Sequence, residues 1–540
     1  MSEVASAIAA RPPAAALLDK KMNKTHARIS GGVVLAALVV GLGFIAFHLT
    51  SDLSSVATGS TWAYILLAIA LLIALGFEFV NGFHDTANAV ATVIYTHSLE
   101  PNIAVVWSGL CNLAGVLTST GTVAFTVITL LPVELILQVS SGAGFAMVFA
   151  LLIAAIIWNL STWWFGLPAS SSHTMVGSII GVGLTNQLMN VHTGTSGVDW
   201  DQAAKVFKVL LISPIVGFGA AGLLFLLSKW LIKYPALYEA PKDNTPPPWP
   251  IRSLLVLTCT GVSFFHGSND GQKGMGLIML ILIGTVPTAY ALNHAVNGQD
   301  TQQFIAASEQ AGHILDRYVD KTGLLGADAR TEVTDYIRTK QLQPDTVLAL
   351  RELVEDVNHE VGLYKELKAV PANQQTNVRN DLYVTSEAIR IMQKTGKPGF
   401  TTQENAGLKS YKTQVDKATK FIPAWVKVAV ALALGMGTMV GWKRIVVTVG
   451  EKIGKEHLTY AQGASAELVA MFTIFAADNW GLPVSTTHVL SSGVAGTMAA
   501  NHSGLQLSTI RNIAAAWVFT LPAAALLSGM LFFLFTRISH

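Results

Sequence analysis

Two short segments place ionisable side chains inside runs of apolar residues. The first, NGFHDTANA at 81–89, follows a run that is about long enough to cross a lipid bilayer. The second, HGSNDGQKG at 266–274, lies within the apolar run 252–285. Ionisable residues are costly at membrane depth, and where they occur they commonly bind or carry ions. The two segments therefore predict a buried polar site for small ions.

Glycines in these segments are interpreted as breaks in membrane helices, at Gly82 in the first copy and at Gly267 and Gly271 in the second. Non-helical backbone at membrane depth is tolerated where it lines a polar cavity, and its carbonyl and amide groups can bind ions. The alternative is a polar network that only holds helices together, although two symmetric copies argue against it. The candidate ligands for a coupling cation or proton are Asn81, His84, Asp85, Asn88, Asn269 and Asp270.

A second pair of motifs, GLPASSSH at 166–173 and GLPVSTTH at 481–488, places a glycine and a proline ahead of three hydroxyl residues and a histidine. The first amides of a helix lack intrahelical partners, and with the helix dipole they form an anion site. Capping would need only one hydroxyl. The predicted anion-binding residues are Ser170, Ser171, Ser172, His173, Ser485, Thr486, Thr487 and His488. The two histidines either contact the anion or carry protons, or they are structural residues.

The motifs together predict the class of ligand. Opposed helix ends that meet near the middle of the membrane would surround a small tetrahedral oxyanion. The carboxylates of Asp85 and Asp270 would repel a bare dianion. We therefore expect a proton or another cation to travel with the anion, or a divalent metal ion to bind at Asp85 and Asp270 in complex with it.

The composition indicates a membrane protein. Of the 540 residues, 51% are hydrophobic and 13% are charged, and the mean hydropathy is +0.48. Soluble domains carry about 25% charged residues. The net charge of +2 gives no indication of nucleic-acid binding. Cys111 and Cys259 lie in apolar runs, which argues against a disulfide framework or a thiolate metal site, and no cofactor is expected.

The motifs repeat along the chain. The segments at 81–89 and 266–274 are 185 residues apart, whereas those at 166–173 and 481–488 are 315 apart, so an insertion lies inside the second repeat. Each repeat has five apolar spans, an odd number, so the second must enter the membrane from the opposite side. Inverted repeats are typical of secondary transporters. The predicted fold is an all-α integral membrane protein with two inverted five-span repeats and broken and re-entrant helices.

The domain organisation follows from the spans and the basic residues beside them. Lysines and arginines flank the junction of the repeats and a later loop, which places both in the cytoplasm and the insertion and C-terminus outside. The predicted parts are an N-terminal tail and anchor span (1–55), a first repeat (60–235), a cytoplasmic Pro-rich linker (236–251), the start of the second repeat (252–294), a soluble helical insertion (295–420) and the remainder of the second repeat (421–540).

The motifs NGFHDTANAVATVIYT, WFGLPASSSHT, NDGQKGMGL and PVSTTHVLSS resemble the inorganic phosphate transporter (PiT) family, in particular its low-affinity, proton-coupled bacterial members. The resemblance covers both repeats. It implies a transporter rather than an enzyme, one that imports inorganic phosphate by symport across the bacterial inner membrane. The phosphate would travel as a neutral complex with magnesium, calcium or zinc, and a homodimer is left open.

One residue departs from the pattern expected of sodium-coupled members, which repeat Asn-Asp-x-x-Asn in both halves. Here Lys273 replaces the second asparagine of the second copy. Because Lys273 is three residues from Asp270 on a helical face, its ammonium would occupy the place of a sodium ion. This favours protons over sodium. Glu78, two turns before Asp85, is then a candidate proton carrier, or else a carboxylate fixed in helix packing.

Other functions fit the residues less well. A sulfate symporter of the same fold is the nearest alternative, because the donors do not separate two tetrahedral anions. A serine–histidine hydrolase would need Ser170 and His173 in one catalytic centre, yet the motif is duplicated. A passive anion channel is the third alternative.

Overall fold

The structure, a computed structural model, describes residues 24–54, 61–138, 141–190, 197–241, 245–320, 325, 328–364 and 367–538, of which residues 24–30, 54, 61–63 and 86–88 are described by their backbone alone. Helices account for nearly all regular structure in these ranges, where the pairing of Gly454 with Leu505 is an isolated β-bridge. The prediction of an all-α protein is therefore confirmed.

Six described helices are long and apolar enough to cross a membrane. They are α3 (Lys24–Ser54), α4 (Thr61–Tyr95), α5 (Pro101–Thr118), α8 (Gly142–Trp164), α10 (Trp200–Leu231) and α22 (Leu507–Ile538). A bent pair, α17 (Thr402–Thr419) and α18 (Ala424–Thr438), passes the same test with a 72° angle between its halves. The chain is thus a multi-pass membrane protein.

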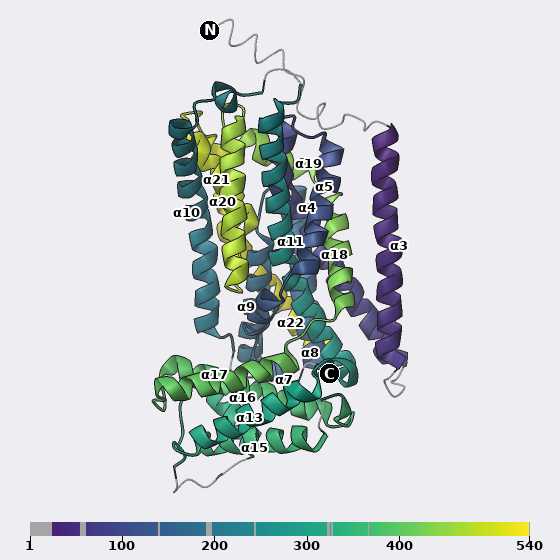
Figure 1. The fold of residues 1–540 in the computed structure, drawn as a ribbon, viewed down its shortest axis with the longest axis vertical. Coiled ribbons are helices and arrows are strands. Elements are labelled where there is room, and N and C mark those ends of the chain that lie inside the picture. Colours follow the sequence, from purple (N-terminus) through teal and green to yellow (C-terminus); the bar gives the residue numbers. More distant parts are fainter. Residues whose placement is uncertain are drawn as a thin grey trace, which may run out of the picture.

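The remaining helices of the bundle are shorter or more polar. They are α6 (Thr122–Ile128), α7 (Val133–Leu137), α9 (Ser171–Met189), α11 (Trp249–Thr285), α12 (Pro287–Tyr290), α19 (Lys443–Val447), α20 (Tyr460–Asn479) and α21 (Thr486–Ala500). Helix α4 packs against α18 and α11 against α5, while α9 packs against α22 and α10 against α21. Figure 1 shows α4 and α11 side by side with opposite chain directions.

The polar segments of α4 and α11 lie between two clusters of buried apolar side chains. One cluster contains Phe77, before Asp85 in α4, and Met275, after Asp270 in α11. The other contains Val90, after Asp85, and residues of α11 that precede Asp270. Both aspartates therefore lie at one level, with apolar packing above and below them.

The predicted breaks at the glycines are wrong, because α4 and α11 are continuous α-helices through both polar segments. The glycines allow helices to approach closely instead. A Cβ on Gly82 would lie 2.2 Å from the carbonyl oxygen of Leu434 in α18, and one on Gly267 would lie 2.2 Å from that of Asn112 in α5. Small residues at such crossings are characteristic of membrane helix pairs.

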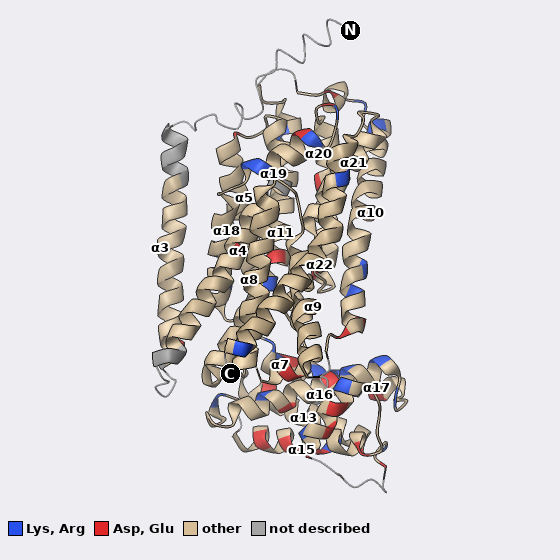
Figure 2. Ribbon diagram, turned by 180° about the vertical axis from the view of Figure 1, so that it is seen from behind, with Lys and Arg blue, Asp and Glu red and all other residues tan. Residues whose placement is uncertain are grey.

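The region between α12 and α18 is a separate helical layer with its own apolar core. Its helices are α13 (Gly298–Leu315), α14 (Ala329–Thr339), α15 (Thr346–Tyr364), α16 (Gln375–Thr395) and α17. Figure 1 shows this layer below the bundle, at the end where α22 finishes and opposite the start of α3. Charged residues concentrate in this layer and at the helix ends (Figure 2).

The helical layer is attached to the bundle by ion pairs at the start of α10. Asp199 lies 2.9 Å from Arg390 of α16 and 3.4 Å from Lys340, which directly follows α14. Asp201 lies 2.9 Å from Lys394. The pairs join acidic residues of the bundle to basic residues of the layer.

Candidate functional site

The two proline-containing turns meet inside the bundle. One connects α8 to α9 and the other connects α20 to α21, and each turns at a glycine with positive φ, Gly166 at 66° and Gly481 at 63°. Glycine adopts this conformation without the penalty that a Cβ would bring. The Ser172 hydroxyl donates a hydrogen bond to the carbonyl oxygen of Val484 at 2.8 Å. The starts of α9 and α21 are therefore in direct contact.

The first hydroxyl of each run caps its helix. The Ser170 Oγ accepts a hydrogen bond from the amide of His173 at 3.2 Å, and the Ser485 Oγ accepts one from the amide of His488 at 3.1 Å. Capping by one hydroxyl thus accounts for these two serines. The other hydroxyls of the runs remain for other partners.

The carboxylate of Asp85 accepts hydrogen bonds from hydroxyl groups of both turns. The Thr487 Oγ1 donates to Oδ1 of Asp85 at 2.6 Å, and the Ser171 Oγ donates to Oδ2 at 2.8 Å. Nδ1 of the neighbouring His84 lies 3.3 Å from Oδ1. All these residues are buried. Two of the predicted anion-binding hydroxyls, those of Ser171 and Thr487, therefore bind an oxyanion, and this oxyanion is the carboxylate of Asp85.

Asp270 pairs with the buried ammonium of Lys273, whose Nζ lies 2.8 Å from Oδ2. The same Nζ donates to the Ser172 Oγ at 2.5 Å, and the Ser171 Oγ lies 3.2 Å from Oδ2 of Asp270. Lys273 has 0% of its surface exposed. A buried ammonium requires such partners because it has lost its hydration. The spacing of three residues brings the pair together on one face of α11, as expected.

His266 is a site residue that the sequence analysis did not select. Its Nε2 lies 3.6 Å from Oδ2 of Asp270 and 3.9 Å from Oδ2 of Asp85, while its Nδ1 is 2.7 Å from Oδ1 of Asn112. Ligand atoms of Asp85, His266 and Asp270 all lie within 4.8 Å of one another, close enough to hold a metal ion. The sequence contained an indication of this role, because His266 aligns with the selected residue Asn81 when the segments 81–89 and 266–274 are compared.

Other predicted residues lie around this centre. Asn269 donates to the carbonyl of Leu482 at 3.1 Å and accepts from the amide of Val484 at 3.3 Å, so it fixes the turn before α21. His84 also contacts Thr162, with 3.1 Å between Nε2 and Oγ1. The side chain of Asn88 lies outside the described residues.

Glu78, Asn81 and Thr486 are buried, with side-chain oxygens that have no hydrogen-bond partner among the described residues. The Glu78 carboxyl lies against Gly274 of α11, where a Cβ would come within 2.1 Å of Oε1. Glu78 thus lies beside α11 on the side of the aspartates that faces the helical layer.

The two histidines that end the hydroxyl runs contact each other. The ring centres of His173 and His488 are 4.4 Å apart, and His488 stacks on Trp517 of α22 at 4.0 Å with 29° between the planes. Nδ1 of His173 and Nε2 of His488 have no hydrogen-bond partner among the described residues. Both rings border the contact between the two turns.

Known proteins match most of the chain. Residues 81–528 match the phosphate transporter family PHO4. The chain is 43% identical over 493 residues to "Low-affinity inorganic phosphate transporter PitA" of Escherichia coli K12, covering 87% of this chain and 96% of that protein. It is 40% identical to PitB of the same organism, with the same coverage, and 27% identical to a probable low-affinity transporter of Bacillus subtilis.

A solved structure titled "The sodium-dependent phosphate transporter" is 19% identical and gives a TM-score of 0.47, covering 88% of this chain and 100% of that one. The relatives are transporters, so the prediction of a transporter rather than an enzyme is confirmed. With 43% identity over most of its length and a family match across both sets of motifs, this chain belongs to the phosphate transporter family.

Proposed function

We propose that this protein imports inorganic phosphate together with protons across the bacterial inner membrane. Membership of the family supports phosphate as the substrate, and the bacterial relatives support the location. The observation that carries the mechanism is the pair of hydroxyls, from Ser171 and Thr487, that converge on the carboxylate of Asp85.

This arrangement sets up a competition between two oxyanions. Ser171 and Thr487 can donate to Asp85 or to a bound phosphate, because each hydroxyl has a single proton to donate. A proton or a cation on Asp85 weakens its hold on the two hydroxyls. Phosphate then gains donors only when positive charge has arrived, which is what symport requires.

The ion pair at Asp270 supports protons as the coupling ions. The ammonium of Lys273 sits 2.8 Å from the carboxylate, where a bound sodium ion would otherwise neutralise it. A covalently attached cation cannot be transported, so the ammonium takes the position that a coupling sodium ion would need beside Oδ2 of Asp270. Glu78, buried two turns from Asp85, is the carboxyl group proposed to pass protons toward the site.

The cluster of Asp85, His266 and Asp270 is proposed to receive a divalent cation that travels as a complex with phosphate. An imidazole ligand beside carboxylates suits zinc, whereas magnesium and calcium prefer oxygen ligands alone. A metal–phosphate complex carries less charge than the free dianion, so it would experience less repulsion from the two aspartates.

The contacts between helices have the symmetry expected of two inverted repeats. Exchange of α4 with α11 and of α5 with α18 converts the α4–α18 contact into the α11–α5 contact. The same exchange of α9 with α21 and α10 with α22 converts the α9–α22 contact into α21–α10. We propose that the repeats move relative to each other around the central site, as in other transporters of this type.

Uptake of labelled phosphate into reconstituted vesicles tests the proposal, with the pH gradient, sodium gradient and divalent metals varied separately. A pH gradient alone should drive accumulation that an uncoupler collapses, and excess sulfate should not compete. Accumulation driven by sodium alone would contradict proton coupling, and inhibition by sulfate would contradict selectivity for phosphate. Uptake that equals the passive leak under every gradient would indicate a channel.

A further inference from the structure

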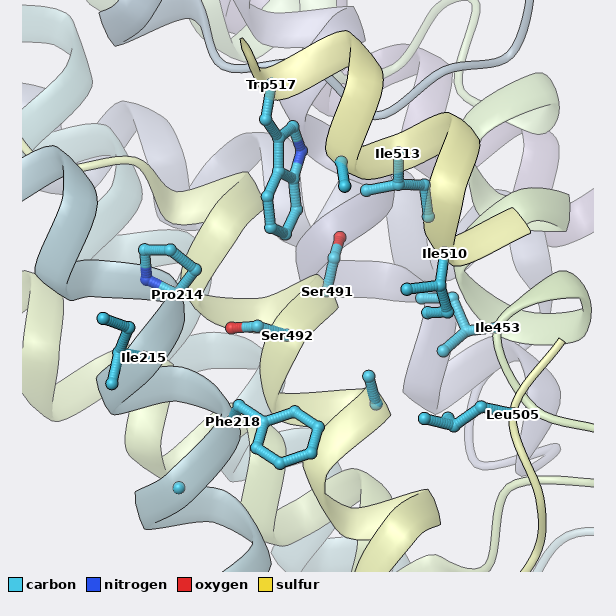
Figure 3. Close-up of a pocket in the computed structure, with 13 residues that line it drawn as sticks. Pro214, Ile215, Phe218, Ile453, Ser491, Ser492, Leu505, Ile510, Ile513 and Trp517 are labelled. Carbon is cyan, nitrogen blue, oxygen red and sulfur yellow. The ribbon is translucent and has the colours of Figure 1, made fainter. Parts of the chain in front are cut away.

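A cavity of about 460 Å³ lies beside the two proline-containing turns, between α10, α21 and the first turns of α22. Its walls are formed by Pro214 and Phe218 of α10, Ser491 of α21, and Ile513 and Trp517 of α22 (Figure 3). Its volume is within the range of pockets that bind small molecules, about 300–1,000 Å³. The lining is almost entirely apolar, so it does not suit phosphate or a metal ion.

The cavity opens on the outer surface of the helical bundle. Ile215 and Phe218, on its rim, are 71% and 43% exposed. An apolar opening on the surface of a membrane-spanning bundle faces lipid rather than water. Acyl chains are the molecules that such an opening meets in a bilayer.

Two serines line this apolar space, and the hydroxyl of Ser492 already donates to the carbonyl oxygen of Val489. Ser491 is 2% exposed, its hydroxyl has no hydrogen-bond partner among the described residues, and Figure 3 shows it directed into the cavity. A buried hydroxyl without a partner is costly unless a ligand supplies an acceptor. The ester carbonyl of a phospholipid is such an acceptor, attached to an acyl chain that fits the apolar walls.

Three exposed basic residues lie close to segments that line the cavity. Lys455 is two residues from the lining residue Ile453, and Arg511 directly follows the lining residue Ile510 in α22. The ammonium of Lys229 in α10 donates to Oδ1 of Asn501 at 3.4 Å, four residues before the lining residue Leu505. Glu456 is the acidic neighbour in this loop. Trp517 is six residues further along α22 than Arg511, or about 9 Å at 1.5 Å per residue. A headgroup bound by these cations would therefore direct its chain toward Trp517.

We propose that the cavity binds one acyl chain of an anionic phospholipid, with the phosphate headgroup at Lys229, Lys455 and Arg511. Basic clusters beside membrane helices commonly bind anionic headgroups. The bound chain packs against Trp517, whose Nε1 donates to the carbonyl of Pro168 at 2.9 Å and whose ring stacks on His488. The lipid thus supports a side chain that contacts both turns of the phosphate site.

Tryptophan quenching by phosphatidylglycerol with brominated acyl chains tests this directly, because bromine quenches indole fluorescence on contact. The purified protein is placed in bilayers of brominated or ordinary lipid. The chain has 12 tryptophans, so the contribution of Trp517 is the difference between the wild type and Trp517→Phe. We expect Trp517 to be quenched by brominated phosphatidylglycerol and less by brominated phosphatidylcholine at equal content.

The second variant fills the cavity with a larger side chain. Gly219 lines the cavity and has nothing within 4 Å of an added Cβ, so Gly219→Leu should fold and exclude the chain. It should lose most of the Trp517 quenching. Gly43→Leu is the matched control, because Gly43 on α3 also has nothing within 4 Å and lies outside the cavity.

Several outcomes would overturn the proposal. Trp517 fluorescence that is equal in brominated and ordinary lipid would show that no chain enters, and quenching unchanged by Gly219→Leu would show that it occurs elsewhere. Equal quenching by the two brominated lipids would reject an anionic headgroup. If Trp517→Phe does not fold, the total tryptophan quenching of Gly219→Leu is compared with that of Gly43→Leu. Equal total quenching of these two variants would also overturn the proposal. None of these readouts depends on phosphate transport.

Discussion

The hydroxyl of Thr487, at the start of α21, lies 2.6 Å from a carboxylate oxygen of Asp85, in the second half of α4. The two residues are far apart in the sequence and belong to different proposed repeats. Their contact joins a proposed anion-binding turn to a proposed cation-binding carboxylate. Because one hydroxyl proton cannot serve both Asp85 and phosphate, the charge on Asp85 should control phosphate binding.

Replacement of Asp85 by Asn should therefore abolish proton-driven uptake. The amide keeps the size of the side chain but removes the negative charge and its titration. A neutral amide holds the two hydroxyls less tightly than a carboxylate does, by about 1.5–3 kcal/mol, so phosphate should bind without a proton and uptake driven by the pH gradient should fall by about tenfold or more. Initial rates in vesicles, normalised to the amount of inserted protein, measure the effect.

The control for this variant is Asp316→Asn. Asp316 is half exposed in the helical layer, where its carboxylate pairs with Arg351 at 3.0 Å. Exposed pairs contribute little, so uptake should be unchanged. If Asp85→Asn transports phosphate as the wild type does, the competition between Asp85 and phosphate does not occur.

Replacement of Lys273 by Asn tests the choice of coupling ion. The change removes the ammonium that neutralises Asp270 and leaves a carboxylate and an amide that can bind sodium. We expect proton-driven uptake to fall and a new dependence on external sodium to appear, measured as uptake against sodium concentration without a pH gradient.

Lys427→Asn is the matched control, because Lys427 is a partly buried lysine of α18 whose ammonium donates to the Ser119 carbonyl at 2.7 Å and not to a carboxylate. This variant should not gain a sodium response. Full proton-driven uptake by Lys273→Asn, without any effect of sodium, would remove the basis for the proposed role of Lys273.

The sequence was sufficient to select residues that the structure brings together but not to determine their geometry. The hydroxyl runs, Asp85 and Asp270 are chemically distinctive and occur twice, so they could be selected without a structure. The prediction at Gly82 is wrong because a glycine in a membrane helix is compatible either with a break in the helix or with close packing against another helix. Its crossing partner, Leu434 of α18, is distant in the chain, so the two cases look alike in sequence.

His266 was missed for a related reason. A single histidine in an apolar run is usually structural, and its contact with Asn112 of α5 depends on how α5 packs against α11. Only the packed helices bring its ring between Asp85 and Asp270. Comparison of the two repeat copies position by position, including Asn81 against His266, would have marked the residue.

The attachment of the helical layer to α10 should depend on pH through Asp199. Burial raises the pKa of this carboxyl, but the amide of Gln202 and the cations Lys340 and Arg390 outweigh it, so the pKa is lowered overall. An unperturbed aspartate has a pKa of about 3.9. The stabilisation is therefore present above about pH 4 and is lost as the pH falls through the lowered pKa.

Asp199→Asn isolates this effect, because asparagine is as good an N-cap as aspartate and keeps the bond to the Gln202 amide, now 3.1 Å. The melting temperature in detergent should be lower for the variant than for the wild type at pH 6, and the difference should shrink as the pH falls below about 4. Asp345→Asn, in the same layer but outside these ion pairs, should show no such dependence. A difference that grows on acidification would have the wrong sign for this account.

Gly82→Ala distinguishes a close helix crossing from a helix break. In the crossing, the added methyl would lie 2.2 Å from the Leu434 carbonyl oxygen and 3.0 Å from the Thr438 amide nitrogen, so α4 and α18 must separate. Overpacking of this kind typically costs about 1–3 kcal/mol. Gly76→Ala, two turns earlier in the same helix, has nothing within 4 Å and should be neutral or stabilising, since alanine favours helix by about 1 kcal/mol over glycine. Measured side by side, the melting temperature should therefore fall for Gly82→Ala and stay unchanged or rise for Gly76→Ala, and equal behaviour would mean that Gly82 is not at a tight crossing.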